Sequence, residues 1–138
     1  MTTTISLLRH GLVENPDAVY YGRLPHFGLA ERGRAQATAA GRYLAGTEVS
    51  ALYHSPMLRA RQTAELVAAQ LAAPVPLLPC DLLTEIHSPY DGETIAAMEE
   101  RHWDFYGEIE PPYETPADIL ARILAFFAHA RAERPGQH

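Results

Sequence analysis

Short apolar runs alternate with longer segments of helical periodicity along this chain, and this alternation limits the folds that it can adopt. Three runs, residues 5–8, 49–54 and 75–78, have the length and aliphatic content of buried strands. Apolar or small residues recur at helical spacing over about 30–45, and again from 56 to just before Pro74. The order strand, helix, strand, helix, strand predicts an α/β fold with a largely parallel sheet.

Capping residues and chain breakers place the remaining elements. Ser55 and Pro56 have the N-cap and first-turn preferences that begin a helix. Residues 12–28 are rich in Pro and Gly and predict a long loop, and a further helix is expected from Thr94 to about Phe105. The final helix is predicted from Pro116 to about Arg131, because Thr115 and Asp118 have the spacing of a capping box.

Composition excludes several classes of protein. A length of 138 residues suits one domain, and the net charge of −6 without a Lys/Arg run argues against a nucleic-acid binder. No apolar stretch approaches the roughly 20 residues of a membrane span, and the N-terminus lacks a signal-peptide pattern. Cys80 is the only cysteine, which excludes a disulfide framework and a cysteine-based metal site. We expect a cytoplasmic protein that binds neither nucleic acid nor membrane.

Charged residues follow each predicted strand. Residues 9–11, Arg-His-Gly, come directly after the first strand, and Arg59 lies in the first turn of the helix that follows the second. The third strand leads to Glu85 and His87. Because the carboxyl ends of parallel strands meet at one edge of a sheet, these side chains should lie close together. Two arginines, a histidine and a carboxylate, without a metal-ligand cluster, indicate metal-free phosphoryl chemistry.

The segments "LLRHG" and "HSPMLRARQTAE" resemble the histidine phosphatase superfamily, also called the phosphoglycerate mutase-like family. The segment "LLTEIH" resembles the stretch that carries the catalytic acid in its phosphatase members, and "YGRLPHFGLAERGRAQA" resembles the loop and helix after the first motif. The similarity runs from residue 5 to the final helix. It implies a three-layer α/β sandwich with a mostly parallel sheet.

The resemblance also implies roles for individual residues. His10 would be the nucleophile, Arg9 and Arg59 would bind the phosphoryl oxygens, and Glu85 would protonate the leaving oxygen and then assist water. The nearby Glu93 is the alternative to Glu85. The remaining residues expected to contact substrate are Gly11, Asn15, Gly22, Arg23 and His87. Asn15 departs from the family pattern, which has its asparagine one position later, where this chain has Pro16. No metal and no cofactor is expected.

The resemblance leaves the activity open between related possibilities. A phosphomonoesterase acting on a small phosphorylated metabolite is the leading prediction, because the short stretch from 86 to 114 disfavours the insertions that mutases of the family carry. The alternatives are a phosphoglycerate mutase-type phosphotransferase and a phospho-ligand-binding pseudoenzyme. The oligomeric state stays open, a homodimer included.

One family feature is missing from the sequence. Members carry a second catalytic histidine, followed by glycine, at the end of a later strand, and no such pair follows the third strand here. The final helix resembles a crossover into a further strand, yet the sequence ends with "ERPGQH", where that strand would begin. We therefore expect residues 1–138 to form one C-terminally incomplete domain that is inactive or very weak alone. Should it prove active, His87 is the first candidate for the second histidine.

Overall fold

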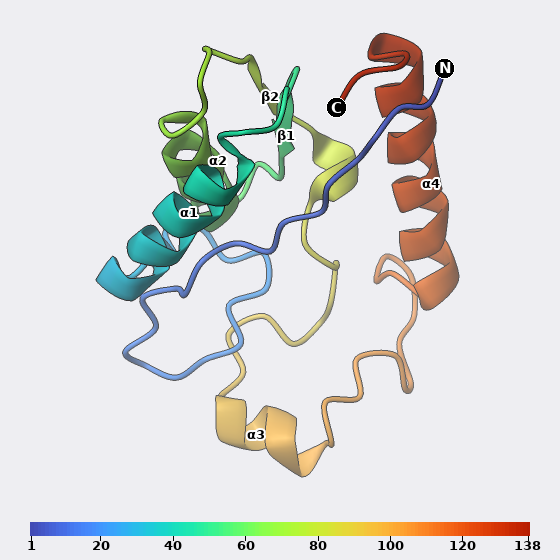
Figure 1. Ribbon diagram of the computed structural model, residues 1–138. Helices are drawn as coiled ribbons and strands as arrows, with labels where there is room; N and C mark the ends of the chain where they lie inside the picture. Colours follow the sequence, from blue (N-terminus) through green and yellow to red (C-terminus); the bar gives the residue numbers. More distant parts are fainter.

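A parallel two-stranded sheet lies between helices in the computed structural model, which describes residues 1–138 (Figure 1). The strands β1 (Leu52–His54) and β2 (Leu77–Pro79) pair in parallel, with Leu52 opposite Leu77. The helices α1 (Glu31–Leu44) and α2 (Leu58–Ala68) lie on one side of the sheet, and α4 (Pro116–Glu133) lies on the other. The predicted layered α/β architecture with parallel strands is confirmed.

Small residues allow α1 and α2 to pack closely. The buried residues of α1 are Gly33, Ala37 and Gly41. A Cβ atom at Gly41 would lie 2.9 Å from the Cα atom of Val67, a buried residue of α2. The small residues at helical spacing over 30–45 predict a face that packs closely on a sheet; the structure instead places this face against α2.

The last helix begins as its capping signals predict. The backbone N–H of Asp118 donates to Thr115 Oγ1 at 3.3 Å, and the backbone N–H of Thr115 donates to Asp118 Oδ2 at 2.9 Å. Pro116 is the first helical residue, and the helix runs to Glu133, two residues beyond the predicted end. Neither this helix nor any other is both long and apolar enough to cross a membrane.

Predicted boundaries of both strands and of helix α2 are wrong. The strand predicted over 49–54 is confined to Leu52–His54, and the one predicted over 75–78 is shifted to Leu77–Pro79, because β1 and β2 pair only over these three residues. Helix α2 spans Leu58–Ala68, so it ends earlier than the predicted position just before Pro74. Its N-cap is Met57, two residues after the predicted cap Ser55, whose Oγ accepts a hydrogen bond from the Met57 N–H at 3.3 Å.

The helix predicted from Thr94 to Phe105 is much shorter. Thr94 does cap it, with its Oγ1 accepting from the Ala97 N–H at 3.1 Å, but α3 spans only Ile95–Glu100. His102 and Trp103 adopt φ angles of 55° and 57°, in the left-handed region that a right-handed helix cannot continue through.

The first predicted strand, residues 5–8, is not a strand. The segment runs between the sheet and α4 without pairing with either strand (Figure 1). Its neighbours are instead near the C-terminus, where Thr4 N–H donates to Gln137 O at 2.9 Å and Ser6 Oγ lies 2.7 Å from His138 Nε2. An extended apolar segment becomes a strand only when another strand lies beside it, and here a cavity separates it from β1.

The loop after this segment is held against α1 by two glycines. A Cβ atom at Gly11 would overlap the backbone of Gly33, and a Cβ atom at Gly33 would overlap the carbonyl oxygen of Leu12. The backbone N–H of Ala30 donates to Leu12 O at 2.9 Å, which fixes the same approach. The absence of side chains at both positions lets the loop that carries His10 lie directly on the start of α1.

This contact predicts the effect of Gly33→Ala. In an open helix the change would gain about 1 kcal/mol of helix propensity. Here the new methyl group overlaps Leu12 O, so we expect a net loss of about 1–3 kcal/mol in the free energy of unfolding. Urea denaturation measures it, with Gly46→Ala as the control because nothing lies within 4 Å of that position. Equal stability of the two variants would show that the loop does not rest on α1.

Candidate active site

One cavity of about 440 Å³ brings together four of the residues singled out by sequence. Arg9, His10, Arg59 and Glu85 all contribute to its lining. Apolar side chains from the N-terminal segment, β1 and α4 make up much of the rest. The cavity therefore combines a mainly apolar wall with a cluster of two arginines, a histidine and a carboxylate.

The ring of His10 has a defined proton arrangement. Its Nδ1 lies 2.8 Å from the carbonyl oxygen of Gly11. Because a carbonyl only accepts hydrogen bonds, Nδ1 carries the proton and Nε2 has a free lone pair when the ring is neutral. Burial lowers the pKa of His10 below the usual 6.5; the hydrogen bond to Gly11 acts in the opposite direction, and the charges of Arg59 and Arg9 lower the pKa further. The neutral, nucleophilic form is thus favoured at neutral pH.

Arg59 is almost completely buried at the start of α2. Its side chain is 2% exposed, and its Nη2 donates to Gly22 O at 2.9 Å and to Glu85 Oε2 at 3.1 Å. The Nε atom is buried and has no hydrogen-bond partner. An unpaired buried N–H group on a cation is costly, so an anion in the cavity that accepted this hydrogen bond would be bound favourably.

Tyr21 links Arg59 to His10. The guanidinium carbon of Arg59 lies 4.7 Å from the centre of the Tyr21 ring, which attracts the cation electrostatically. The same ring meets His10 edge-on, with 6.4 Å between the ring centres, and stacks on Phe27. Sequence analysis gave no role to Tyr21, because a tyrosine in a loop carries no signal of which ring or cation it will contact.

Thr63 is a second contact that sequence analysis missed. Its Oγ1 accepts from the Gly11 N–H at 3.2 Å and donates to Arg59 O at 2.8 Å. The buried hydroxyl therefore connects the His10 loop to α2, the helix that carries Arg59. Its position four residues after Arg59 in the second motif is the signal that could have indicated this role.

Arg9 differs from Arg59 in its surroundings. It is exposed, and its side chain makes no hydrogen bond or ion pair with the protein. Its charge is consequently available to a ligand in the cavity that it lines.

The loop from 12 to 28 supplies three predicted contacts, and none of their residues lines the cavity. Gly22 has φ +36°, and a Cβ there would overlap Asp91, so the turn requires glycine. The Arg23 N–H donates to Asp91 Oδ2 at 3.0 Å on the same turn. Asn15 Nδ2 donates to Val19 O at 2.9 Å, and Asn15 Oδ1 accepts from the Val19 N–H at 3.2 Å. The Asn15 side chain therefore stabilises its own turn. Substrate contact by these residues stays a prediction.

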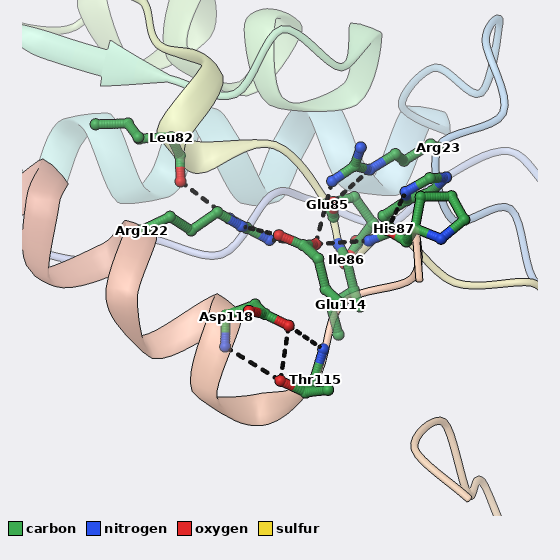
Figure 2. Close-up of polar contacts among 10 residues, drawn as sticks. Arg23, Leu82, Glu85, Ile86, His87, Glu114, Thr115, Asp118 and Arg122 are labelled. Carbon is green, nitrogen blue, oxygen red and sulfur yellow. Dashed lines mark hydrogen bonds and ion pairs between the residues drawn. The ribbon is translucent and has the colours of Figure 1, made fainter. Parts of the chain in front are cut away.

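Glu85 and His87 lie in the loop after β2, within a network of polar contacts (Figure 2). Besides its bond to Arg59, Glu85 accepts the Ile86 N–H at 2.9 Å through Oε1. The ring of His87 packs against Tyr113, and its Nδ1 lies 3.1 Å from Pro112 O, outside the cavity lining. The predicted contact of His87 with substrate therefore also stays a prediction.

Glu114 and Arg122 complete this network, and sequence analysis missed both. Arg122 donates to Glu114 Oε1 at 2.6 Å and to Leu82 O at 2.9 Å (Figure 2). Nothing in the local sequence around Glu114 distinguishes it from a surface acid before a helix cap. No group of three or more His, Cys, Asp or Glu side chains is arranged to hold a metal ion.

Comparison with known proteins shows which family this chain belongs to. The chain matches the histidine phosphatase superfamily (branch 1) over residues 5–138. The chain belongs to the histidine phosphatase superfamily. The motifs around His10 and Arg59 that suggested this family lie within the matched residues.

Several known proteins resemble this chain over most of its length. The uncharacterized Mycobacterium tuberculosis protein Rv0525 is 33% identical, over 97% of this chain and 69% of that protein. Bacillus stearothermophilus YhfR is 26% identical, with a TM-score of 0.79 over 94% of this chain and 67% of YhfR. A mycobacterial glucosyl-3-phosphoglycerate phosphatase in complex with VO3 is 25% identical, with a TM-score of 0.73 over 91% and 66% of the two chains. The chain spans about two thirds of the length of these relatives.

The environment of His10 predicts its titration. The unfolded chain takes up a proton on each histidine at a pKa of about 6.5. Since the folded pKa of His10 is lowered, this ring stays neutral as the pH falls through 6.5 and is protonated only at lower pH. NMR titration of the ring protons, with the peak assigned from its absence in His10→Ala, should give a midpoint below 6.5. A midpoint above 6.5 would mean that burial and the two arginines do not govern this ring.

Proposed function

We propose that this protein hydrolyses the phosphate monoester of a small metabolite through a phosphohistidine at Nε2 of His10. The observation that carries the proposal is the hydrogen bond from His10 Nδ1 to Gly11 O, which leaves Nε2 with a lone pair in a cavity lined by Arg9 and Arg59. An imidazole lone pair beside two guanidinium groups is suited to attack on a phosphorus atom whose oxygens those groups bind.

Binding comes first in this proposal. The unpaired Nε of Arg59 and the free side chain of Arg9 bind the oxygens of the phosphoryl group. Arginine is suited to this task because its planar fork can donate two parallel hydrogen bonds to one phosphate. The two guanidinium groups supply the positive charge that metal ions supply in other phosphatases, so we expect activity without a metal.

The transfer step then uses His10 and Glu85. As Nε2 bonds to phosphorus, the bond from phosphorus to the leaving oxygen breaks, and the Glu85 carboxyl gives its proton to that oxygen. In the second step Glu85 takes a proton from water, the water oxygen bonds to phosphorus, and the N–P bond breaks to release phosphate and neutral His10.

The similar proteins support the proposed phosphatase activity. A relative with the same fold is a glucosyl-3-phosphoglycerate phosphatase, and its structure contains the oxyanion VO3. A small phosphorylated substrate is therefore the class that we propose. The cytoplasmic location, the absence of nucleic-acid and membrane partners and a homodimer stay predictions.

The nucleophile can be tested directly. The full-length protein incubated with a phosphate monoester should acquire acid-labile, base-stable phosphate, and His10→Ala should acquire none because the attacking nitrogen is gone. His26→Ala is the matched control, since this exposed histidine makes no contact with the cavity. Phosphate that persists in His10→Ala would reject His10 as the nucleophile.

The variant Arg59→Lys tests whether Arg59 binds the phosphoryl group. Lysine keeps the charge but loses the planar fork, so we expect transition-state binding to weaken by about 2–4 kcal/mol, roughly 30-fold or more in kcat/KM. Arg61→Lys is the control, because Arg61 is 56% exposed two residues further along the helix. A change in kcat/KM of less than a few-fold for Arg59→Lys would place Arg59 outside the reaction.

A further inference from the structure

Glu114 collects an unusual number of donors for a carboxylate outside the cavity. Its Oε1 accepts from Arg122 Nε at 2.6 Å, and its Oε2 accepts from Arg122 Nη2 at 3.1 Å. Oε2 also accepts from Arg23 Nη2 at 3.2 Å and from the backbone N–H of His87 at 2.7 Å (Figure 2). The side chain is 16% exposed, and these charge-assisted bonds hold its pKa below the usual value despite burial, which acts in the opposite direction.

Each residue that donates a hydrogen bond to Glu114 either belongs to the loop that carries Glu85 or also binds that loop. Arg23 Nε donates to the carbonyl oxygen of Glu85 at 2.6 Å, and Arg122 Nη1 donates to Leu82 O at 2.9 Å. His87 donates its own N–H and accepts the Glu114 N–H at 2.9 Å through its carbonyl oxygen. The loop is thus held before Glu85, at Glu85 and after it by groups that all meet at one carboxylate.

The backbone of Glu114 is fixed by the start of α4. It directly precedes Thr115, whose capping box with Asp118 fixes the start of α4. Glu114 itself does not line the cavity, so it can influence the reaction only through the residues that it binds.

Glu114 also determines what Arg23 can bind. The guanidinium of Arg23 is divided between Glu114 and the backbone of Glu85, with Nε already at the carbonyl oxygen of Glu85. Without the charge on Glu114, the guanidinium of Arg23 could turn to the carboxylate of Glu85 or to Asp91, whose Oδ2 accepts the Arg23 backbone N–H at 3.0 Å. Glu85 is already paired with Arg59 at 3.1 Å, and a second arginine on the same carboxylate would further stabilise its ionised form and oppose the protonation that the leaving oxygen requires.

We infer that Glu114 is the positioning residue for the general acid: it fixes the loop of Glu85 and keeps Arg23 away from the Glu85 carboxylate. The inference rests on the role proposed above for Glu85. We assign Arg122 a role in the same positioning, because its guanidinium binds both Glu114 and the carbonyl oxygen of Leu82 and so connects Glu114 to the Glu85 loop.

The variant Glu114→Gln tests the inference, because it keeps the shape but removes the charge and one acceptor. Glu65→Gln is the matched control, since the exposed carboxylate of Glu65 contacts only Arg61, at 3.8 Å. The first measurement is amide hydrogen exchange by NMR without substrate. The amides of His87 and Ile86 should exchange about tenfold faster or more in Glu114→Gln than in the wild type or Glu65→Gln, while Val67 in α2 is unchanged.

The second measurement is turnover of two phosphate esters by the full-length protein. The leaving group of p-nitrophenyl phosphate departs without a proton, whereas that of β-glycerophosphate needs one. Glu114→Gln should therefore lose about tenfold more kcat on β-glycerophosphate than on p-nitrophenyl phosphate. In a Glu85→Gln background the second substitution should change kcat on β-glycerophosphate by less than about twofold, because both act through the same group.

Equal losses on both esters, or unchanged exchange at His87 and Ile86, would overturn the inference. If the wild type hydrolyses neither ester, the proposed function fails, and the exchange rates still decide whether Glu114 holds the Glu85 loop. If Glu114→Gln does not fold, Arg122→Lys replaces it, since lysine keeps the charge but cannot bridge Glu114 and Leu82 with a fork. The same pattern with smaller changes supports the inference, and unchanged exchange and turnover reject it.

Discussion

The buried guanidinium of Arg59 is the constraint around which the rest of the site is arranged. A cation removed from water is stable only when acceptors and polarisable groups surround it. These come from two separate loops: Gly22 O and the Tyr21 ring from the loop before α1, and Glu85 from the loop after β2. Both loops are therefore drawn to the start of α2, where the His10 loop is attached through Thr63.

Features governed by local physics could be predicted from the sequence. The start of α4 follows from Thr115, Pro116 and Asp118, whose interactions span only a few residues. The packing face of α1 follows from the spacing of Gly33 and Ala37. The family could be named because two motifs, around His10 and Arg59, each carry several specific residues in a fixed order.

Features that depend on distant partners could not be predicted. Residues 5–8 have the composition of a strand, but pairing requires a neighbouring strand, and their composition says nothing about whether one lies there. Glu114 is separated from its partners Arg23 and His87 by 91 and 27 positions. Its own neighbours in sequence carry no sign of either contact. Tyr21 was missed for the same reason, since its stacking on Arg59 joins two elements.

The contact between Gly11 and Gly33 has a consequence for how the molecule opens. With backbone lying directly on backbone, no side chain can rearrange to let the His10 loop separate while α1 stays in place. The loop and the first turn of α1 must then open as a single cooperative unit, which exposes the backbone bond of Ala30 to Leu12 O at the same moment. The orientation of the His10 imidazole therefore depends on the first turn of α1 staying folded, although His10 belongs to a loop.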